Sequence, residues 1–342
     1  MISIDDARTN GRRVVQETLE GALWKRNEEF SMELINNEAM ISIDDARTNG
    51  RRVVQETLEG ALWKRNEEFS MELINNEAMI SIDDARTNGR RVVQETLEGA
   101  LWKRNEEFSM ELINIINEHR FSHHPIYQTN HSPFRDHRSE KIFYQEYGQL
   151  MEVVTHGVIH ALNACTQLQS RLGTKAVYGA RFLLQINLLD ELGFRTGQTR
   201  SRCYAGHPYL SHFMQYAESM SQIGISVQEL ETHRLTDECG AFCRCFTNNY
   251  GDYARLICVL ALFDKVFADT ISEWSIEVAK SSGLDVSQGY YSIGVGGNDA
   301  TDTWYLFRQA ITPEHYQEMR VLTLETLETW AVWLDRLLTL SC

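Results

Sequence analysis

The sequence predicts an all-α protein with about seven helices. Apolar residues recur at three- and four-residue spacings over long stretches, which is the period of an amphipathic helix. The chain of 342 residues contains only 4 prolines, so few residues interrupt these patterns. Breaks fall at Gly173, 193–206, 248–251 and 283–297, where Gly and Asn adopt the positive φ that ends a helix. The helical stretches of the unique region are 139–172, 175–193, 207–222, 226–247, 252–282, 299–311 and 313–339.

The first third of the chain is a repeat. Residues 1–39 recur without change as 40–78, and their first 36 residues recur again as 79–114. Solenoid repeats diverge at exposed positions, whereas every position is identical here, which indicates a recent duplication of DNA or an artefact. Each 39-residue copy carries eight acidic and five basic residues, so two copies account for −6 of the net charge of −15. We expect residues 1–78 to be surplus helical segments and residues 79–342 to form one functional domain.

Within the third copy, the pattern predicts an amphipathic helix. Ser81 or Asp83 is a suitable N-terminal cap, and apolar residues fall at helical spacings from Val92 to Ile116. One face of this helix must therefore be buried. We expect Trp102 to anchor that face in the core.

Charge and hydropathy exclude several classes of protein. The net charge of −15 and the isoelectric point of about 5.2 repel phosphate backbones and anionic lipids, so nucleic-acid binding is disfavoured. The longest apolar run, from Ile257 to Phe263, has seven residues, whereas a membrane helix needs about 20. With no export signal in the first residues, we expect a soluble, cytoplasmic protein.

Two other patterns suggest metal sites only weakly. The segment 118–138 holds five histidines without helical period, and we expect it to be a solvated loop. Cys239, Cys243 and Cys245 lack the paired spacing of a zinc site. Because the seven cysteines are odd in number and irregularly spread, we expect reduced thiols.

The most informative stretch runs from Asn187 to Phe213. The residues Asn-Leu-Leu-Asp-Glu-Leu-Gly end at Gly193, and His-Pro-Tyr-Leu-Ser-His-Phe begins at His207. This pair of motifs resembles the haem-oxygenase-like diiron oxidases and oxygenases, including the chlamydial death-domain-associated protein and its uncharacterised cyanobacterial relatives. The resemblance covers roughly residues 140–340 and implies a haem-oxygenase-like helical bundle. It extends to the last helix, whose Trp330 and Trp333 are similar to that family's aromatic C-terminal helix.

The resemblance also implies a set of iron ligands. In the diiron members, carboxylates and histidines from several helices bind two irons that activate O2. Glu191 and His207 match two of these ligands, although the interval between them is longer than the family's. Asp264 stands where the next helix carries a Glu. Carboxylates and imidazoles hold iron while leaving positions open for O2.

An upstream ligand is open to three interpretations. Glu152, His156 and His160 share one helix face at i, i+4 and i+8, so any of them could point into the bundle. Two partly buried histidines beside a solvated Glu would give the same pattern without binding a metal.

The chain departs most from the family at the last ligand motif. Tyr290 and Tyr291 resemble its lead-in, and we expect them to line a substrate pocket. A His-x3-Asp-x2-His trio should follow, but the chain offers no histidine, and Asp299 and Asp302 stand in one of the two possible registers. Losing both imidazoles should weaken iron binding severely. Iron held by substitute ligands, a single metal and no metal all remain open.

The first functional hypothesis is an O2-dependent oxidoreductase that uses one or two iron ions to act on a small organic substrate, such as an amino acid or fatty acid derivative. The alternative is a catalytically inactive or metal-free protein that binds a ligand or a partner through the same bundle. A metal-free oxidase or a thiaminase-like hydrolase is the third. Homodimers are expected from the fold analogy.

Overall fold

A computed structural model describes residues 81–128, 134, 136–195, 205–293 and 297–340. All but Ser81 belong to one compact unit that spans Ile82–Thr196 and Ala205–Cys342. The surplus copies at 1–78 lie outside the described residues. The helices are α4 (Ile82–Gln94), α5 (Gly99–Glu118), α6 (His137–Ala164), α7 (Gln169–Glu191), α8 (His212–Ser221), α9 (Val227–Thr232), α10 (Asp237–Thr247), α11 (Tyr253–Val266), α12 (Ser272–Ser281), α13 (Gly297–Ala310) and α14 (Tyr316–Thr339).

The all-α prediction is confirmed for this unit, but the number of helices was underestimated. The stretch 226–247 is two helices, because Ser226 forms a capping box at α9 and Thr236 caps α10. The predicted stretch 252–282 is helical from Tyr253 to Ser281, with a π-helical turn, Phe267–Ile271, between α11 and α12. The expected break at Gly173 is present as a kink with φ of 77° within α7.

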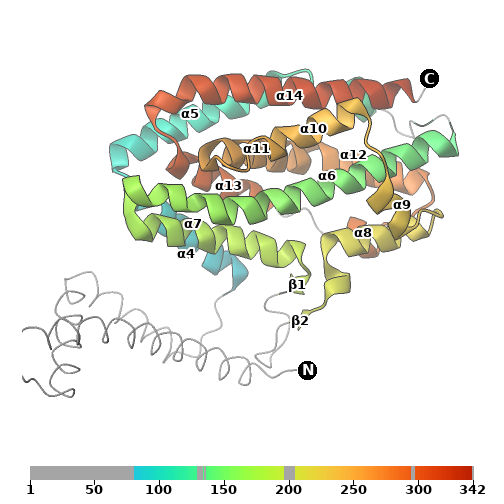
Figure 1. Ribbon diagram of the computed structural model, residues 1–342, viewed down its shortest axis with the longest axis horizontal. Coiled ribbons are helices and arrows are strands. Elements are labelled where there is room, and N and C mark those ends of the chain that lie inside the picture. The colour runs from blue at the N-terminus through green and yellow to red at the C-terminus, as the bar shows by residue number, and fades with distance from the viewer. Residues whose placement is uncertain (1–80, 129–133, 135, 196–204, 294–296, 341–342) are drawn as a thin grey trace, which may run out of the picture. The chain divides into compact units, whose positions relative to one another are not determined.

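Helix α11 lies at the centre of the bundle and contacts α6, α10, α13 and α14 (Figure 1). Every residue from Leu256 to Phe263 is buried. The longest apolar run of the sequence is therefore a core helix, hydrophobic on all sides because it is surrounded on all sides. In the described ranges, no helix is both long and apolar enough to cross a membrane.

The aromatic residues of α14 close the core. Trp330 and Trp333 are fully buried, and Trp330 stacks on Phe242 of α10 with ring centroids 4.8 Å apart. The Trp333 indole N–H donates to the buried carboxylate of Glu146, 2.9 Å away. Trp102 is also buried, at 5% exposure, so its predicted role as a core anchor is confirmed.

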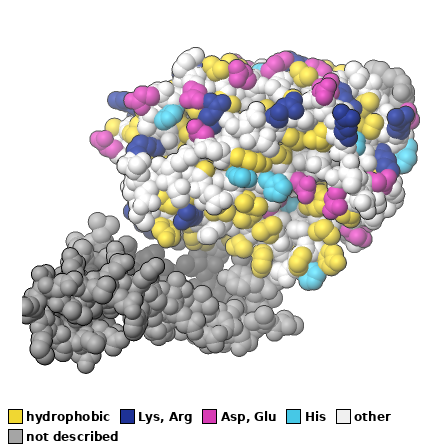
Figure 2. All heavy atoms as spheres, in the orientation of Figure 1, with side chains coloured by type: hydrophobic (Ala, Val, Ile, Leu, Met, Phe, Trp, Pro, Cys, Tyr) yellow, Lys and Arg dark blue, Asp and Glu magenta, His cyan; other side chains and the backbone are white. Residues whose placement is uncertain are grey.

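A short pairing of two-residue strands, β1 (Phe194–Arg195) and β2 (Ala205–Gly206), brings the start of α8 back toward the end of α7. Phe194 pairs with Gly206 in antiparallel register. Exposed apolar side chains gather along α7 and this pairing (Figure 2). They include Tyr178, Phe182, Leu189, Leu192 and Phe194.

Candidate functional site

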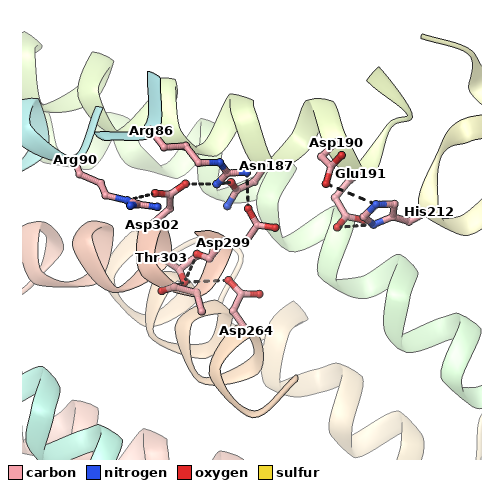
Figure 3. Close-up of polar contacts among 11 residues, drawn as sticks. Arg86, Arg90, Asn187, Asp190, Glu191, His212, Asp264, Asp299, Asp302 and Thr303 are labelled. Atoms are coloured by element: carbon pink, nitrogen blue, oxygen red, sulfur yellow. Dashed lines mark hydrogen bonds and ion pairs between the residues drawn. The ribbon is translucent and has the colours of Figure 1, made fainter. Parts of the chain in front are cut away.

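Four ionisable side chains from four helices form the candidate site, which we call the central cluster (Figure 3). They are Glu191 at the end of α7, His212 at the start of α8, Asp264 on α11 and Asp299 on α13. The imidazole Nδ1 of His212 lies 3.0 Å from Oε1 of Glu191. The Thr155 hydroxyl donates to Oε2 of the same carboxylate at 3.1 Å. These two contacts hold the Glu191 carboxylate between α6 and α8.

The environment of His212 favours its protonated form. Burial lowers the pKa of the imidazole, but the hydrogen bond and charge of Glu191 and the charges of Asp190 and Asp299 outweigh it. The net result is a raised pKa. An imidazolium next to Glu191 is the consequence.

The two aspartates of the central cluster are driven toward their neutral forms. Burial raises the pKa of Asp264 well above its usual range, and the charges of Asp299 and Glu191 act in the same direction. The hydroxyl of Thr303, which donates to Asp264 at 2.9 Å, opposes this shift. Burial also raises the pKa of Asp299 to about 6, against the opposing effect of Arg86.

The central cluster is accessible from solvent. The side chains of Asp299, Glu191 and His212 are 36%, 23% and 17% exposed, and Asp264 is half-buried. These three side chains therefore reach the surface in part. This distinguishes the cluster from a sealed structural network.

A buried ion network adjoins the central cluster. Asp302 has no exposed surface and contacts the guanidinium of Arg86 and that of Arg90, the latter at 2.5 Å. Arg86 also donates to the amide oxygen of Asn187 at 2.8 Å and lies 2.7 Å from Oδ1 of Asp299. Figure 3 shows Asp299 between this network and the pair of Glu191 and His212. Asp302 is therefore neutralised by arginines contributed by α4.

This donor set does not fit the iron site that the resemblance implies. Within the described parts of the chain, no group of three or more His, Cys, Asp or Glu side chains lies close enough to hold a metal ion. Arg86 already contacts Asp302 and Oδ1 of Asp299, so Asp302 is not available as an iron ligand. Glu191, Asp264 and Asp299 do share one cluster, but not as a converged ligand set.

His207 lies apart from the central cluster. It is exposed, its ring stacks on Tyr209 with centroids 5.2 Å apart, and its Nδ1 accepts a hydrogen bond from the Tyr209 backbone N–H at 3.2 Å. His212, five residues later, takes the position beside Glu191.

The sequence contained a signal for His212 that the motif obscured. His212 and Tyr216 are one helical turn apart, and Tyr216 is fully buried. The first residue of α8 therefore lies on the inward face, whereas His207 precedes the helix.

The row of Glu152, His156 and His160 is also separate from the central cluster. Both histidines are exposed, and Glu152 is half-buried. His160 stacks face to face on Tyr250 with centroids 3.8 Å apart. The i, i+4, i+8 spacing of these three residues places them on a face of α6 that is largely turned toward solvent.

Tyr290 borders the central cluster, and Tyr291 packs behind it. The Tyr290 ring lies edge-to-face with the His212 imidazole at 6.4 Å, and its hydroxyl is 3.4 Å from that of Tyr147. Tyr291 packs against Tyr290 at 5.2 Å, and its buried hydroxyl has no hydrogen-bond partner among the described residues. An aromatic wall thus stands beside the carboxylates.

Comparisons with known proteins add no assignment. No family model matches the sequence, and no curated protein is significantly similar to it.

Proposed function

We propose that the helical unit is a haem-oxygenase-like bundle that binds a small organic cation, such as a primary amine, at the central cluster without a resident metal. The fold assignment is supported by the motif from Asn187 to Gly193, which ends α7, and by the buried tryptophans of α14.

An excess of acidic groups carries the proposal for the ligand. The carboxyl groups in and beside the central cluster are those of Asp190, Glu191, Asp264, Asp299 and Asp302, and the cations are Arg86, Arg90 and His212. Because burial and neighbouring carboxylates disfavour the ionised forms of Asp264 and Asp299, a cationic ligand would stabilise those ionised forms. The buried ring of Tyr290 lies beside His212 and gives the cluster an apolar border.

The chain's own residues would then divide the work of binding. Asp264 and Asp299 would accept hydrogen bonds from the ammonium group, while Thr303 holds the Asp264 carboxyl in place. Glu191 is already paired with His212, and its negative charge would attract the ammonium group without a direct contact. The ring of Tyr290 would contact the carbon skeleton of the ligand.

Saturation-transfer NMR on the full chain tests this proposal with n-pentylamine as the probe and the neutral n-pentanol as its counterpart. We expect binding of the amine, none of the alcohol at equal concentration, and loss of amine binding in Asp264→Asn/Asp299→Asn. The matched control is Asp269→Asn, an exposed aspartate paired with Lys265, which should bind as the wild type does. Equal binding of both probes would overturn the proposal.

A second measurement decides between this function and the iron-dependent oxidoreductase of the first hypothesis. The protein is loaded with Fe(II) under anaerobic conditions and its iron content is determined by elemental analysis, beside a Glu191→Ala/His212→Ala variant. We expect no iron above the level of the variant. Bound iron that the variant loses would contradict a metal-free site and favour O2 chemistry on a small substrate.

A further inference from the structure

The surface that holds the third repeat copy is built of specific contacts, and we call it the repeat-docking surface. It consists of the sides of α7, α13 and the start of α14 that face residues 82–112. On α4, Arg86 bonds Asn187 and contacts Asp302. Gly89 lets the two helices approach closely, since a methyl group there would lie 2.6 Å from the Leu183 side chain. These contacts require an arginine and a glycine one turn apart.

Helix α5 is recognised with equal specificity. The buried Asn105 amide donates to the carbonyls of Arg308 and Ile311 at 2.7 and 3.0 Å, and it accepts from the Tyr316 hydroxyl at 2.7 Å. Phe108 stacks on Tyr316 with ring centroids 4.1 Å apart. Asn105 thus satisfies the free carbonyls at the end of α13, which few other side chains could do.

Every repeat-side residue in these contacts lies within 79–114, the segment that recurs unchanged as 40–75. Arg47 corresponds to Arg86, Asn66 to Asn105 and Phe69 to Phe108. The segment 40–75 therefore carries the same side chains at the same spacings. Nothing in the contacts of 82–112 allows the repeat-docking surface to discriminate between the two.

We propose that residues 40–75 can replace residues 79–114 on the repeat-docking surface of the same chain. The two segments are joined to one chain, so their effective concentrations are about millimolar or higher and binding by either is favoured over binding between chains. The third copy holds the surface in the wild type because α5 continues beyond the repeat to the buried Ile116. This inference is independent of the ligand proposed above.

Charge reversal in one copy at a time tests the replacement in the full chain. Arg86→Glu would place a carboxylate against Asp299 and Asp302, so the third copy is expelled. The comparison is among Arg86→Glu, Arg8→Glu/Arg47→Glu and the triple variant, each by urea unfolding. We expect the double variant to unfold like the wild type. The midpoint of the triple variant should fall by more than the sum of the other two changes, because the surface then has no intact segment.

Equal midpoints for Arg86→Glu and the triple variant would overturn the proposal, since the preceding copies would then provide no rescue. A second series, Trp102→Ala beside Trp24→Ala/Trp63→Ala and their combination, repeats the comparison without charge reversal. Light scattering should show the same oligomeric state for Arg86→Glu as for the wild type. A dimer formed only by that variant would assign the incoming segment to a second copy of the chain and contradict replacement within one chain.

Discussion

The contact between Glu191 and His212 predicts a change in the pKa of His212 that NMR can measure on the signal of this one imidazole. The change is Glu191→Gln, which keeps the shape of the side chain and its acceptor for Thr155 but removes the charge. In the wild type the carboxylate and the imidazole are 3.0 Å apart, with about a fifth of each side chain exposed. A charge-assisted hydrogen bond in such a place contributes about 1.5 kcal/mol, toward the lower end of the range because of partial solvent screening.

That energy corresponds to a change of about one pKa unit for His212, since one unit is about 1.4 kcal/mol. We expect the raised pKa of His212 to fall by this amount in Glu191→Gln. The sign on stability follows from linkage. A histidine whose pKa is raised by folding stabilises the protein below its unfolded value of about 6.5, and this contribution is lost as the pH rises through the folded pKa. Glu191→Gln should therefore destabilise more at about pH 6 than at about pH 9.

The assay is an NMR titration of labelled histidine, with the His212 signal assigned by its absence in His212→Gln. The matched control is Asp190→Asn, because Asp190 is half-exposed and lies 3.8 Å from the other ring nitrogen. Its effect on the pKa of His212 should be smaller. If Glu191→Gln moved the His212 titration no further than Asp190→Asn does, the pairing described here would be refuted.

Two further predictions concern packing and pH. Gly89→Ala should lower the free energy of unfolding in urea by about 1–3 kcal/mol, because the added methyl group would lie 2.6 Å from Leu183 Cδ2 and overpack the contact. The control is Gly99→Ala, whose added methyl group has no atom within 4 Å. This variant should be as stable as the wild type or more stable. Asp299 has a pKa raised to about 6, so its ionisation opposes folding increasingly as the pH rises from its unfolded value of about 4 through 6. Asp299→Asn should therefore gain stability relative to the wild type between pH 4 and pH 7, while the exposed Asp269→Asn should show a constant difference.

Each of these two predictions would be contradicted by a specific result. Equal unfolding midpoints for the two alanine variants would mean that α4 and α7 are not in close contact at Gly89. A difference between Asp299→Asn and the wild type that is the same at both pH values would mean that the Asp299 carboxyl titrates as a solvated group does.

The helical class, the kink at Gly173 and the buried Trp102 follow from local pattern, since hydrophobic period and backbone preference act over a few residues. The break between α9 and α10 was missed because the cap Thr236 lies within one continuous apolar pattern. The hydrophobic period shows which face of a helix is buried. It does not reveal a turn between two helices when the apolar spacing continues across that turn.

Glu191, Asp264 and Asp299 were sequence candidates, but the histidine of the central cluster depends on tertiary structure. The motif favoured His207, but the return of the chain after β2 places the first turn of α8, and so His212, beside Glu191. Likewise Arg86 and Asp302 are 216 residues apart, and neither has a local pattern that identifies the other. Charges so distant along the chain are paired by the packing of α4 against α7 and α13. Local sequence patterns therefore predict where helices form and which faces they bury, whereas long-range packing of the helices decides which charges meet.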